Sequence, residues 1–230
     1  MADLGRHWEL ERIAMRLWPS ATLIQGMNTA LFDLLDKHKI DAAQIRKVRV
    51  RLSPQAFAMH GGFDTYKAKF EALLSAHYTA AVVLHDRALT QAQFEPARYD
   101  DPKLRAFAAK QVEVGAEPSI GGSQAIVDID MADGKTLSAR CEHPLGSFEN
   151  PVSRVQIEQK FRTYAQGFLP DAHIADVIGA VERLEDFGSV RRLMDLLRVV
   201  PRAMAAAAPE SISGPTRVSW LRGSPTATEA

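Results

Sequence analysis

The chain has 230 residues, of which 46% are hydrophobic and 24% are charged, proportions typical of a globular protein. Its 28 basic and 28 acidic side chains cancel, so no global field is expected to attract nucleic acid or an anionic membrane. The sequence lacks both an apolar run of the ~18–20 residues that span a bilayer and the pattern of a secretory signal. A single cysteine, Cys141, excludes an internal disulfide. We therefore expect a cytoplasmic protein that binds neither nucleic acid nor membrane.

The first part of the chain predicts helices before a single strand. Residues 4–15 have a short amphipathic pattern that indicates a helix. Thr22 to His38 carry apolar residues at i, i+3, i+4 and i+7, which predicts a helix with one buried face. Ile45 to Leu52 alternate apolar and basic residues, as expected of a half-buried strand whose basic side chains point outward. Pro54 should end that strand.

Two helices and a small group of strands are predicted next. Lys67 to Leu84 have the period of one helix, whose buried side chains would include Phe70, Leu73, Leu74 and Ala81. A short helix should begin at Asp101-Pro102 and run through Lys110, since proline is tolerated in a first turn. Val112 to Val114 predict a brief strand. Residues 125–140 predict a hairpin, because alternating apolar and polar residues flank the turn signal Asp133-Gly134.

The last third of the chain is predicted to be helical, over residues 154–166, 171–184 and 188–199. Beyond Pro201 the sequence is rich in alanine and then in serine, proline, glycine and threonine, which favours a disordered or loosely docked tail. The order of the elements predicts an α+β fold. It consists of a small, mostly antiparallel sheet with helices packed on it, followed by C-terminal helices.

The residues that could carry metal, phosphate or acid–base chemistry are scattered. His77 and His85 do not form a clean i, i+4 ligand pair, and Cys141-Glu142-His143 is only a fragment of a site, so no metal is expected. Gly121-Gly122-Ser123 has the composition of a phosphate-binding loop, but it precedes a strand rather than a helix, and a strand-entry loop is the simpler interpretation. His60 and His77 are each titratable near neutral pH, although an isolated histidine is usually solvated or structural.

Several short motifs occur in a consistent order along residues 3–197. Gly5-Arg-His-Trp8 precedes Arg16-Leu-Trp-Pro19, and Lys69-Phe70 precedes Tyr78-Thr-Ala-Ala81. Later in the chain come the predicted hairpin, the sequence Asn150-Pro-Val-Ser153, and Lys160-Phe-Arg162. Taken together, this order resembles the C-terminal part of the MmgE/PrpD family of dehydratases, decarboxylases and epimerases.

The resemblance implies a division of the chain into four regions. They are a crossover segment (1–20), an α+β lid-like domain (21–150), C-terminal helices that would pack on a helical domain (151–200), and a flexible tail (201–230). In the family, the active site lies between such a lid and an all-helical domain that supplies most of the catalytic groups. We expect the helical half to be missing from this sequence and therefore to come from a partner subunit.

The resemblance also implies three site residues on the lid: a cation at the crossover, a histidine shortly after the proline, and a tyrosine on a following helix. Arg16, Gln25 and Tyr78 occupy these positions. Arginine keeps the charge and can bind a carboxylate through two hydrogen bonds, but it does not donate a proton near neutral pH. Arg16 and Gln25 are therefore predicted to bind substrate, and Tyr78 to be catalytic. The alternatives are a surface arginine and a tyrosine at the margin of the core.

The activity that the resemblance implies is the removal or shift of a proton next to a carboxylate, on a small di- or tricarboxylic acid, without metal or organic cofactor. Three hypotheses follow. The chain is one subunit of a split enzyme with a helical partner, a non-catalytic lid-like binding or interaction module that is a degenerate remnant of the family, or an enzyme completed by homodimerisation. The third has the least support, because no acid–base pair is evident in the sequence.

Overall fold

The computed structural model describes residues 5–6, 8–186 and 188–198, and these fall into two compact units. The first unit ends at Val152 and the second begins at Ser153. The tail predicted for residues 201–230 lies outside the described residues.

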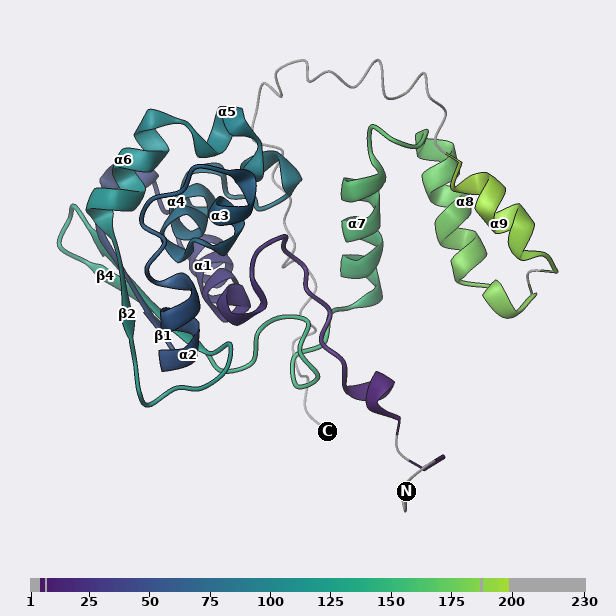
Figure 1. Cartoon of the computed structure of the whole chain (residues 1–230), viewed down its shortest axis with the longest axis horizontal. Helices are drawn as coiled ribbons and strands as arrows, with labels where there is room; N and C mark the ends of the chain where they lie inside the picture. Colours follow the sequence, from purple (N-terminus) through teal and green to yellow (C-terminus); the bar gives the residue numbers. More distant parts are fainter. Residues whose placement is uncertain (1–4, 7, 187, 199–230) are drawn as a thin grey trace. The chain divides into compact units, whose positions relative to one another are not determined.

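A four-stranded sheet lies at the centre of the first unit (Figure 1). Its spatial order is β2 (Val112–Ala116), β1 (Ile45–Leu52), β3 (Ala125–Met131), β4 (Thr136–Cys141). β3 pairs antiparallel with both β1 and β4, whereas β2 pairs parallel with β1. The predicted α+β fold with a small, mostly antiparallel sheet is therefore confirmed.

Three helices cover one face of this sheet: α1 (Gln25–Lys37), α4 (Ala76–Asp86) and α6 (Pro102–Gln111) (Figure 1). All residues from Ala76 to Leu84 are buried, so α4 is enclosed on every side rather than amphipathic. Alternate residues of the two central strands face these helices and are almost fully buried: Val48, Val50 and Leu52 of β1 and Ala125, Val127 and Ile129 of β3. The core of the first unit lies between the sheet and these helices.

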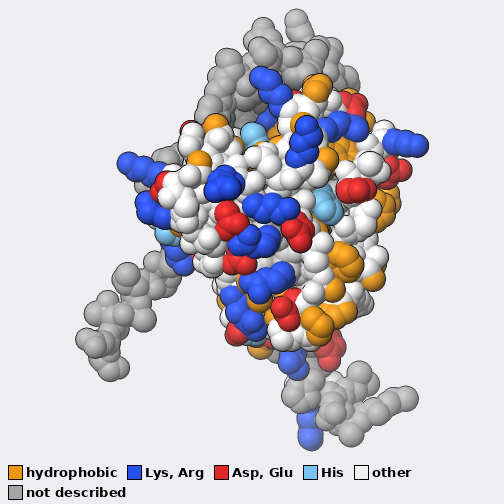
Figure 2. All heavy atoms as spheres, turned by 90° about the vertical axis from the view of Figure 1, so that its left-hand side faces the viewer, with side chains coloured by type: hydrophobic (Ala, Val, Ile, Leu, Met, Phe, Trp, Pro, Cys, Tyr) orange, Lys and Arg blue, Asp and Glu red, His pale blue; other side chains and the backbone are white. Residues whose placement is uncertain are grey.

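The opposite face of the sheet carries paired charges. Arg49 of β1 binds Asp130 of β3 through two hydrogen bonds, and Arg51 binds Asp128 at 2.7 Å. Figure 2 shows positive and negative side chains intermingled on this side of the molecule. The prediction that the basic residues of this strand point outward is confirmed, and cross-strand carboxylates neutralise them.

Shorter elements connect these helices and strands. They are η1 (Glu9–Arg12), η2 (Thr22–Ile24), η3 (Ala42–Gln44), α2 (Pro54–His60), α3 (Lys69–Leu74), η4 (Gln91–Phe94) and α5 (Pro96–Tyr99). The helix predicted over residues 4–15 shrinks to the single 3₁₀ turn η1 in the described residues. Helix α2 was not predicted, although Ser53 caps it and Pro54 occupies its first turn. Pro54 thus both ends the strand and begins a helix.

The single helix predicted over residues 67–84 is two helices. Ser75 has extended backbone angles that end α3, and its hydroxyl accepts a hydrogen bond from the N–H of Tyr78, which caps α4. The break changes the direction in which α3 presents its side chains. Phe70 is consequently 70% exposed, and its predicted burial is wrong.

The second unit is helical in its described part. It contains α7 (Arg154–Ala165), α8 (Asp171–Val181), η5 (Leu184–Asp186) and α9 (Val190–Leu196). A reciprocal capping box begins α7, in which the Ser153 hydroxyl and the Gln156 side chain each accept a backbone N–H. Among the described residues, no helix is long and apolar enough to cross a membrane.

We predict that Gly26→Ala destabilises the first unit. A Cβ at Gly26 would lie 1.9 Å from the carbonyl oxygen of Ser123, so α1 and the loop before β3 would have to separate. Such overpacking typically costs about 1–3 kcal/mol. The measurement is urea unfolding together with amide hydrogen exchange of α1.

Gly179→Ala, at a glycine inside α8, is the matched control for Gly26→Ala. Its nearest neighbour would be the end of the Arg183 side chain at 4.0 Å, and alanine is the better helix former by about 0.5–1 kcal/mol. Gly179→Ala should therefore strengthen exchange protection in α8. Equal tolerance of alanine at both positions would contradict the close approach of α1 to Ser123.

Candidate functional site

An open cleft of about 360 Å³ lies in the first unit, where the crossover segment meets the N-terminal end of α1. Four stretches of chain line it: the end of the crossover segment, the η2–α1 turn, the loop before β3 and the loop after β4. The polar and charged lining residues are Arg16, Thr22, Gln25, Ser123, Gln124, Glu142, His143, Ser147 and Glu149. The cleft therefore collects residues that are more than 100 positions apart in the sequence.

Backbone hydrogen bonds hold the loop after β4, residues 142–150, against the rest of the cleft. The N–H of Met15 donates to the carbonyl of Gly146 at 2.8 Å, and the N–H of Gly146 donates to the carbonyl of Asn150 at 2.8 Å. The N–H of Leu145 donates to the hydroxyl of Thr29 on α1 at 3.0 Å. These bonds fix the crossover segment, the 142–150 loop and α1 relative to one another.

Gly146 is required at the centre of this arrangement. Its φ is +96°, in the region that favours glycine, and a Cβ there would lie 2.0 Å from the carbonyl oxygen of Met15. The backbones of the loop and the crossover segment approach more closely than any side chain permits. Arg16, the residue after Met15, is positioned by this contact.

Arg16 lies exposed on the cleft, and its guanidinium Nη1 donates to the carbonyl of Ser20 at 3.3 Å. A guanidinium in a concave site is suited to binding a carboxylate, because its planar array of donors matches two carboxylate oxygens. The structure thus places the first of the predicted substrate-binding residues on the cleft.

Gln25 also lies at the cleft, but its amide group points into the protein. The side chain is only 3% exposed, and Nε2 donates to the carbonyls of Trp18 and Ser20 and to the hydroxyl of Ser20 at 2.9–3.3 Å. Asn28, one turn further along α1, donates to the same hydroxyl at 2.7 Å. Because the two amide hydrogens of Gln25 are already engaged, this residue anchors the crossover segment to α1.

Tyr78 is not brought to the cleft. Its side chain is fully buried, its ring packs against Tyr66 and Phe94 with centroids 4.9 and 5.8 Å apart, and its hydroxyl donates to the carbonyl of Gln93. Burial raises the pKa of the phenol above its ordinary value, which disfavours proton release. The geometry is that of a core tyrosine, and the catalytic role of Tyr78 stays a prediction.

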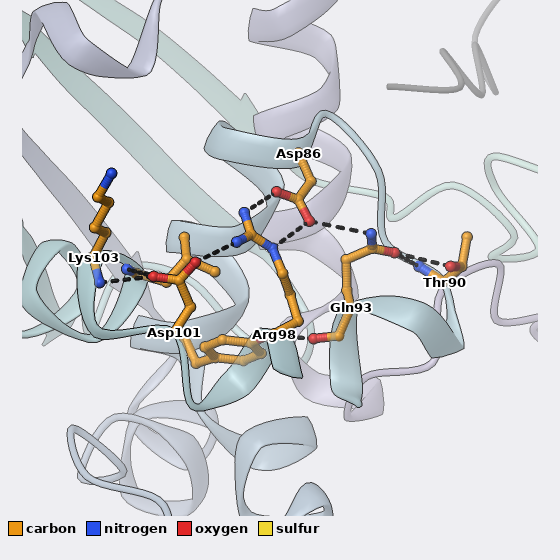
Figure 3. A network of polar contacts seen from close by, with 8 residues as sticks. Asp86, Thr90, Gln93, Arg98, Asp101 and Lys103 are labelled. Carbon is orange, nitrogen blue, oxygen red and sulfur yellow. Dashed lines mark hydrogen bonds and ion pairs between the residues drawn. The ribbon is translucent and has the colours of Figure 1, made fainter. Parts of the chain in front are cut away.

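A polar network holds the segment to which Tyr78 donates (Figure 3). The amide of Gln93 donates to Asp86 at 3.2 Å and its oxygen accepts from the N–H of Thr90 at 2.8 Å. Arg98 binds Asp86 and also Asp101, the latter at 2.8 Å. The network joins the end of α4 to η4, α5 and the start of α6, so Tyr78 belongs to a structural connection.

The remaining candidate residues are mostly buried. His60 and His77 are 3% and 9% exposed, and burial lowers the pKa of each imidazole. Burial likewise raises the pKa of the Cys141 thiol to about 11, which keeps it protonated near neutral pH. In the described part of the chain, no three His, Cys, Asp or Glu side chains are grouped as metal ligands would be.

The 142–150 loop contributes site residues that sequence reasoning missed. His143 and Glu149 both line the cleft, with Nδ1 and Oε2 3.8 Å apart. The Pro/Gly-rich composition of this loop indicated only that the strand had ended. What places its side chains at the cleft is the tertiary contact between Gly146 and Met15, for which the sequence carries no local signal.

The fold and the cleft define a small α+β domain that presents an arginine-bearing cleft beside its N-terminal crossover. Comparison with known families identifies the domain: the MmgE/PrpD C-terminal domain matches residues 18–186. The chain belongs to the MmgE/PrpD family.

Curated relatives agree with this assignment. The cis-aconitate decarboxylase of Homo sapiens is 27% identical over 134 residues, which cover 57% of this chain and 28% of that protein. The cis-aconitate decarboxylase of Mus musculus is 28% identical over 134 residues, with the same shares. The matched region thus spans little more than a quarter of these relatives.

We predict that Tyr78→Phe lowers the free energy of unfolding by about 1–2 kcal/mol, because the part-buried hydrogen bond from its hydroxyl to the carbonyl of Gln93 is lost. Tyr66→Phe is the control, since the Tyr66 hydroxyl is buried without a hydrogen-bond partner among the described residues. Its removal should leave stability unchanged or slightly raised. Denaturant unfolding of both variants measures the difference. An unchanged free energy of unfolding in Tyr78→Phe would refute the structural role of the Tyr78 hydroxyl.

We predict that Gly146→Ala opens the cleft. The new Cβ would collide with the Met15 carbonyl, so the Met15 N–H should lose its bond and exchange faster with solvent. Gly134→Ala in the hairpin turn is the control, because its φ of +86° is also positive but nothing lies within 4 Å of the added atom. Hydrogen exchange of residues 13–17 should respond to the first variant and not to the second.

Proposed function

We propose that this domain forms one wall of the active site of a cofactor-independent lyase or isomerase that acts on a small di- or tricarboxylic acid. Arg16 binds a substrate carboxylate in the cleft. The observation that carries the proposal is the placement of this guanidinium, in a domain of the MmgE/PrpD family, on a cleft built by four converging segments. The two relatives are named for decarboxylation of cis-aconitate, a tricarboxylate, which supports the substrate class.

The second wall comes from an all-helical domain on a separate partner chain. Such a domain would supply the proton-abstracting base and, by covering the cleft, would exclude water and strengthen the interaction of Arg16 with a developing negative charge. Large exposed apolar side chains next to lining residues of the cleft support a docking partner, since Ile13 and Phe148 are 59% and 52% exposed.

The alternative is a non-catalytic module that binds a small acid without turnover. Two features favour it. The cation at the crossover is an arginine, which does not donate a proton near neutral pH, and the amide hydrogens of Gln25 are committed to the crossover segment. In this alternative the cleft keeps its affinity for carboxylates and lacks only the groups that move protons.

We predict that Arg16→Ala weakens binding of citrate to the full chain about 10- to 100-fold, because a charge-assisted hydrogen-bonded pair with a carboxylate is lost. Arg16→Lys should retain part of the affinity, since it keeps the charge without the paired donors. Arg46→Ala, an exposed arginine of β1 that does not line the cleft, is the control. Isothermal titration calorimetry measures the effect, and identical affinities for the Arg16 and Arg46 variants would refute the role of Arg16.

Co-expression with a helical MmgE/PrpD N-terminal-domain protein separates the two candidates. A stable complex that converts a di- or tricarboxylate, and loses that turnover in Arg16→Ala, establishes the split enzyme. Carboxylate binding by the chain without complex formation or turnover establishes the binding module. Turnover by a homodimer of the chain alone would instead identify a self-sufficient enzyme.

A further inference from the structure

The strand β4 forms one edge of the sheet and is weakly protected there. It pairs antiparallel with β3 without a register shift, and in the described part of the chain no strand pairs with its other side. Its sequence contains no proline, and its only charged side chain is Arg140. Natural sheets usually block such an edge with proline, charged side chains, a bulge or a covering segment, because an open edge pairs readily with another strand.

The backbone of β4 presents its outward hydrogen-bonding groups at alternate residues. The N–H of Met131 donates to the carbonyl of Lys135 at 2.8 Å, which makes these residues the first hydrogen-bonded pair of the β3–β4 hairpin. Because such pairs alternate in an antiparallel ladder, every second residue of β4 is bonded to β3 and the residues between them point away from it. In the register of this hairpin, the outward groups belong to Thr136, Ser138 and Arg140.

The inner face of β4 is incompletely covered. Leu137 and Ala139 pack against the core but are only half-buried. Their neighbours on β3, Ile129 and Val127, are fully buried. A further strand beside β4 would cover the open sides of Leu137 and Ala139. The edge therefore offers apolar surface together with outward backbone groups.

This edge is complementary to a second copy of itself. If two β4 strands lie antiparallel with Ser138 opposite the partner's Ser138, then Thr136 lies opposite the partner's Arg140, and the outward N–H and carbonyl groups of both strands are paired. A shift of the register leaves some of these groups unpaired. Arg140 comes beside the partner's Thr136, a residue whose hydroxyl donates to Asp130 at 2.7 Å, so the guanidinium approaches a carboxylate. The pairing thus satisfies hydrogen bonds and brings opposite charges together.

We propose that two copies of this chain associate through β4, so that their sheets join into one continuous sheet with Ser138 at its two-fold axis. The inference goes beyond the proposed function and does not depend on it, because the contact requires neither a carboxylate nor a helical partner. A contact made mainly by one strand edge belongs to the small class of protein interfaces, so the self-association is weak and depends on concentration.

Sedimentation equilibrium of the full chain tests the association. The average mass of the wild type should rise with concentration toward twice the mass of the chain. Ser138→Lys and Ser138→Glu should each weaken self-association about tenfold, because like charges would lie directly opposite each other across the two-fold axis. An equimolar mixture of the two variants should associate at least as tightly as the wild type, because opposite charges then face each other.

Ser119→Lys and Ser119→Glu are the matched controls. Both serines are exposed, and each hydroxyl donates to a carboxylate: that of Ser138 to Asp128 at 2.6 Å, and that of Ser119, in the loop after β2, to Glu117 at 2.8 Å. The Ser119 variants change the charge of the chain in the same way and leave the β4 edge intact, so they should associate as the wild type does. Thermal unfolding of all four variants verifies that the domain remains folded.

Amide hydrogen exchange locates the contact within β4. In dilute protein, the N–H groups of Ser138 and Arg140 should exchange rapidly, whereas those of Leu137 and Ala139 should exchange slowly because they are bonded to β3. In concentrated protein, all four should exchange slowly.

Two results would overturn the inference. The first is a wild type that stays monomeric up to about 1 mM, whether the Ser138 N–H exchanges rapidly or is protected by another part of the chain. The second is a wild type whose association is unchanged by both Ser138 substitutions, which would place the interface elsewhere. Neither result bears on carboxylate binding by the cleft, so the proposed function is tested separately.

Discussion

The candidate site depends on one backbone contact, the approach of Gly146 to Met15. A hydrogen bond of 2.8 Å joins the two residues, and the missing Cβ of Gly146 leaves room for the Met15 carbonyl. Through this contact, a loop that follows the last strand is fixed to the segment that precedes the first helix of the domain. Arg16 lies on one side of it, and His143 and Glu149 lie on the other. Both segments are also bonded to α1, but this contact is the one that joins them directly.

The first turn of α1 supports that arrangement from the inside. Gln25 and Asn28 hold the crossover segment by its Ser20 hydroxyl, while Gly26 allows the helix to touch the loop before β3. A residue that the family resemblance suggested as a ligand-binding group is thus part of the framework. The same is true of Tyr78, whose hydroxyl joins α4 to the network around Arg98.

The strands were the part of the fold that the sequence predicted best. β1 and β3 largely alternate buried and half-buried residues, and that pattern is set locally by the side chains themselves. The predicted helix boundaries were less accurate where a capping residue starts or ends a helix against the periodicity of the apolar residues. Ser75 interrupts one predicted helix, and Ser53 begins a helix that was not predicted. In each case a single hydroxyl caps the new helix. For the site, Arg16 could be predicted because a motif marks it, whereas His143 could not, since its position depends on a contact between residues 131 positions apart.

The paired charges on the outer face of the sheet restrict where this domain can associate with another protein. Arg49 is paired with Asp130 and Arg51 with Asp128, and all four side chains are partly exposed. A protein that covered them would have to strip water from four ions and would gain no unpaired charge to bind in return. That side of the sheet is consequently a poor surface for docking, whereas exposed apolar side chains on the crossover side, such as Ile13 and Phe148, can be dehydrated at little cost.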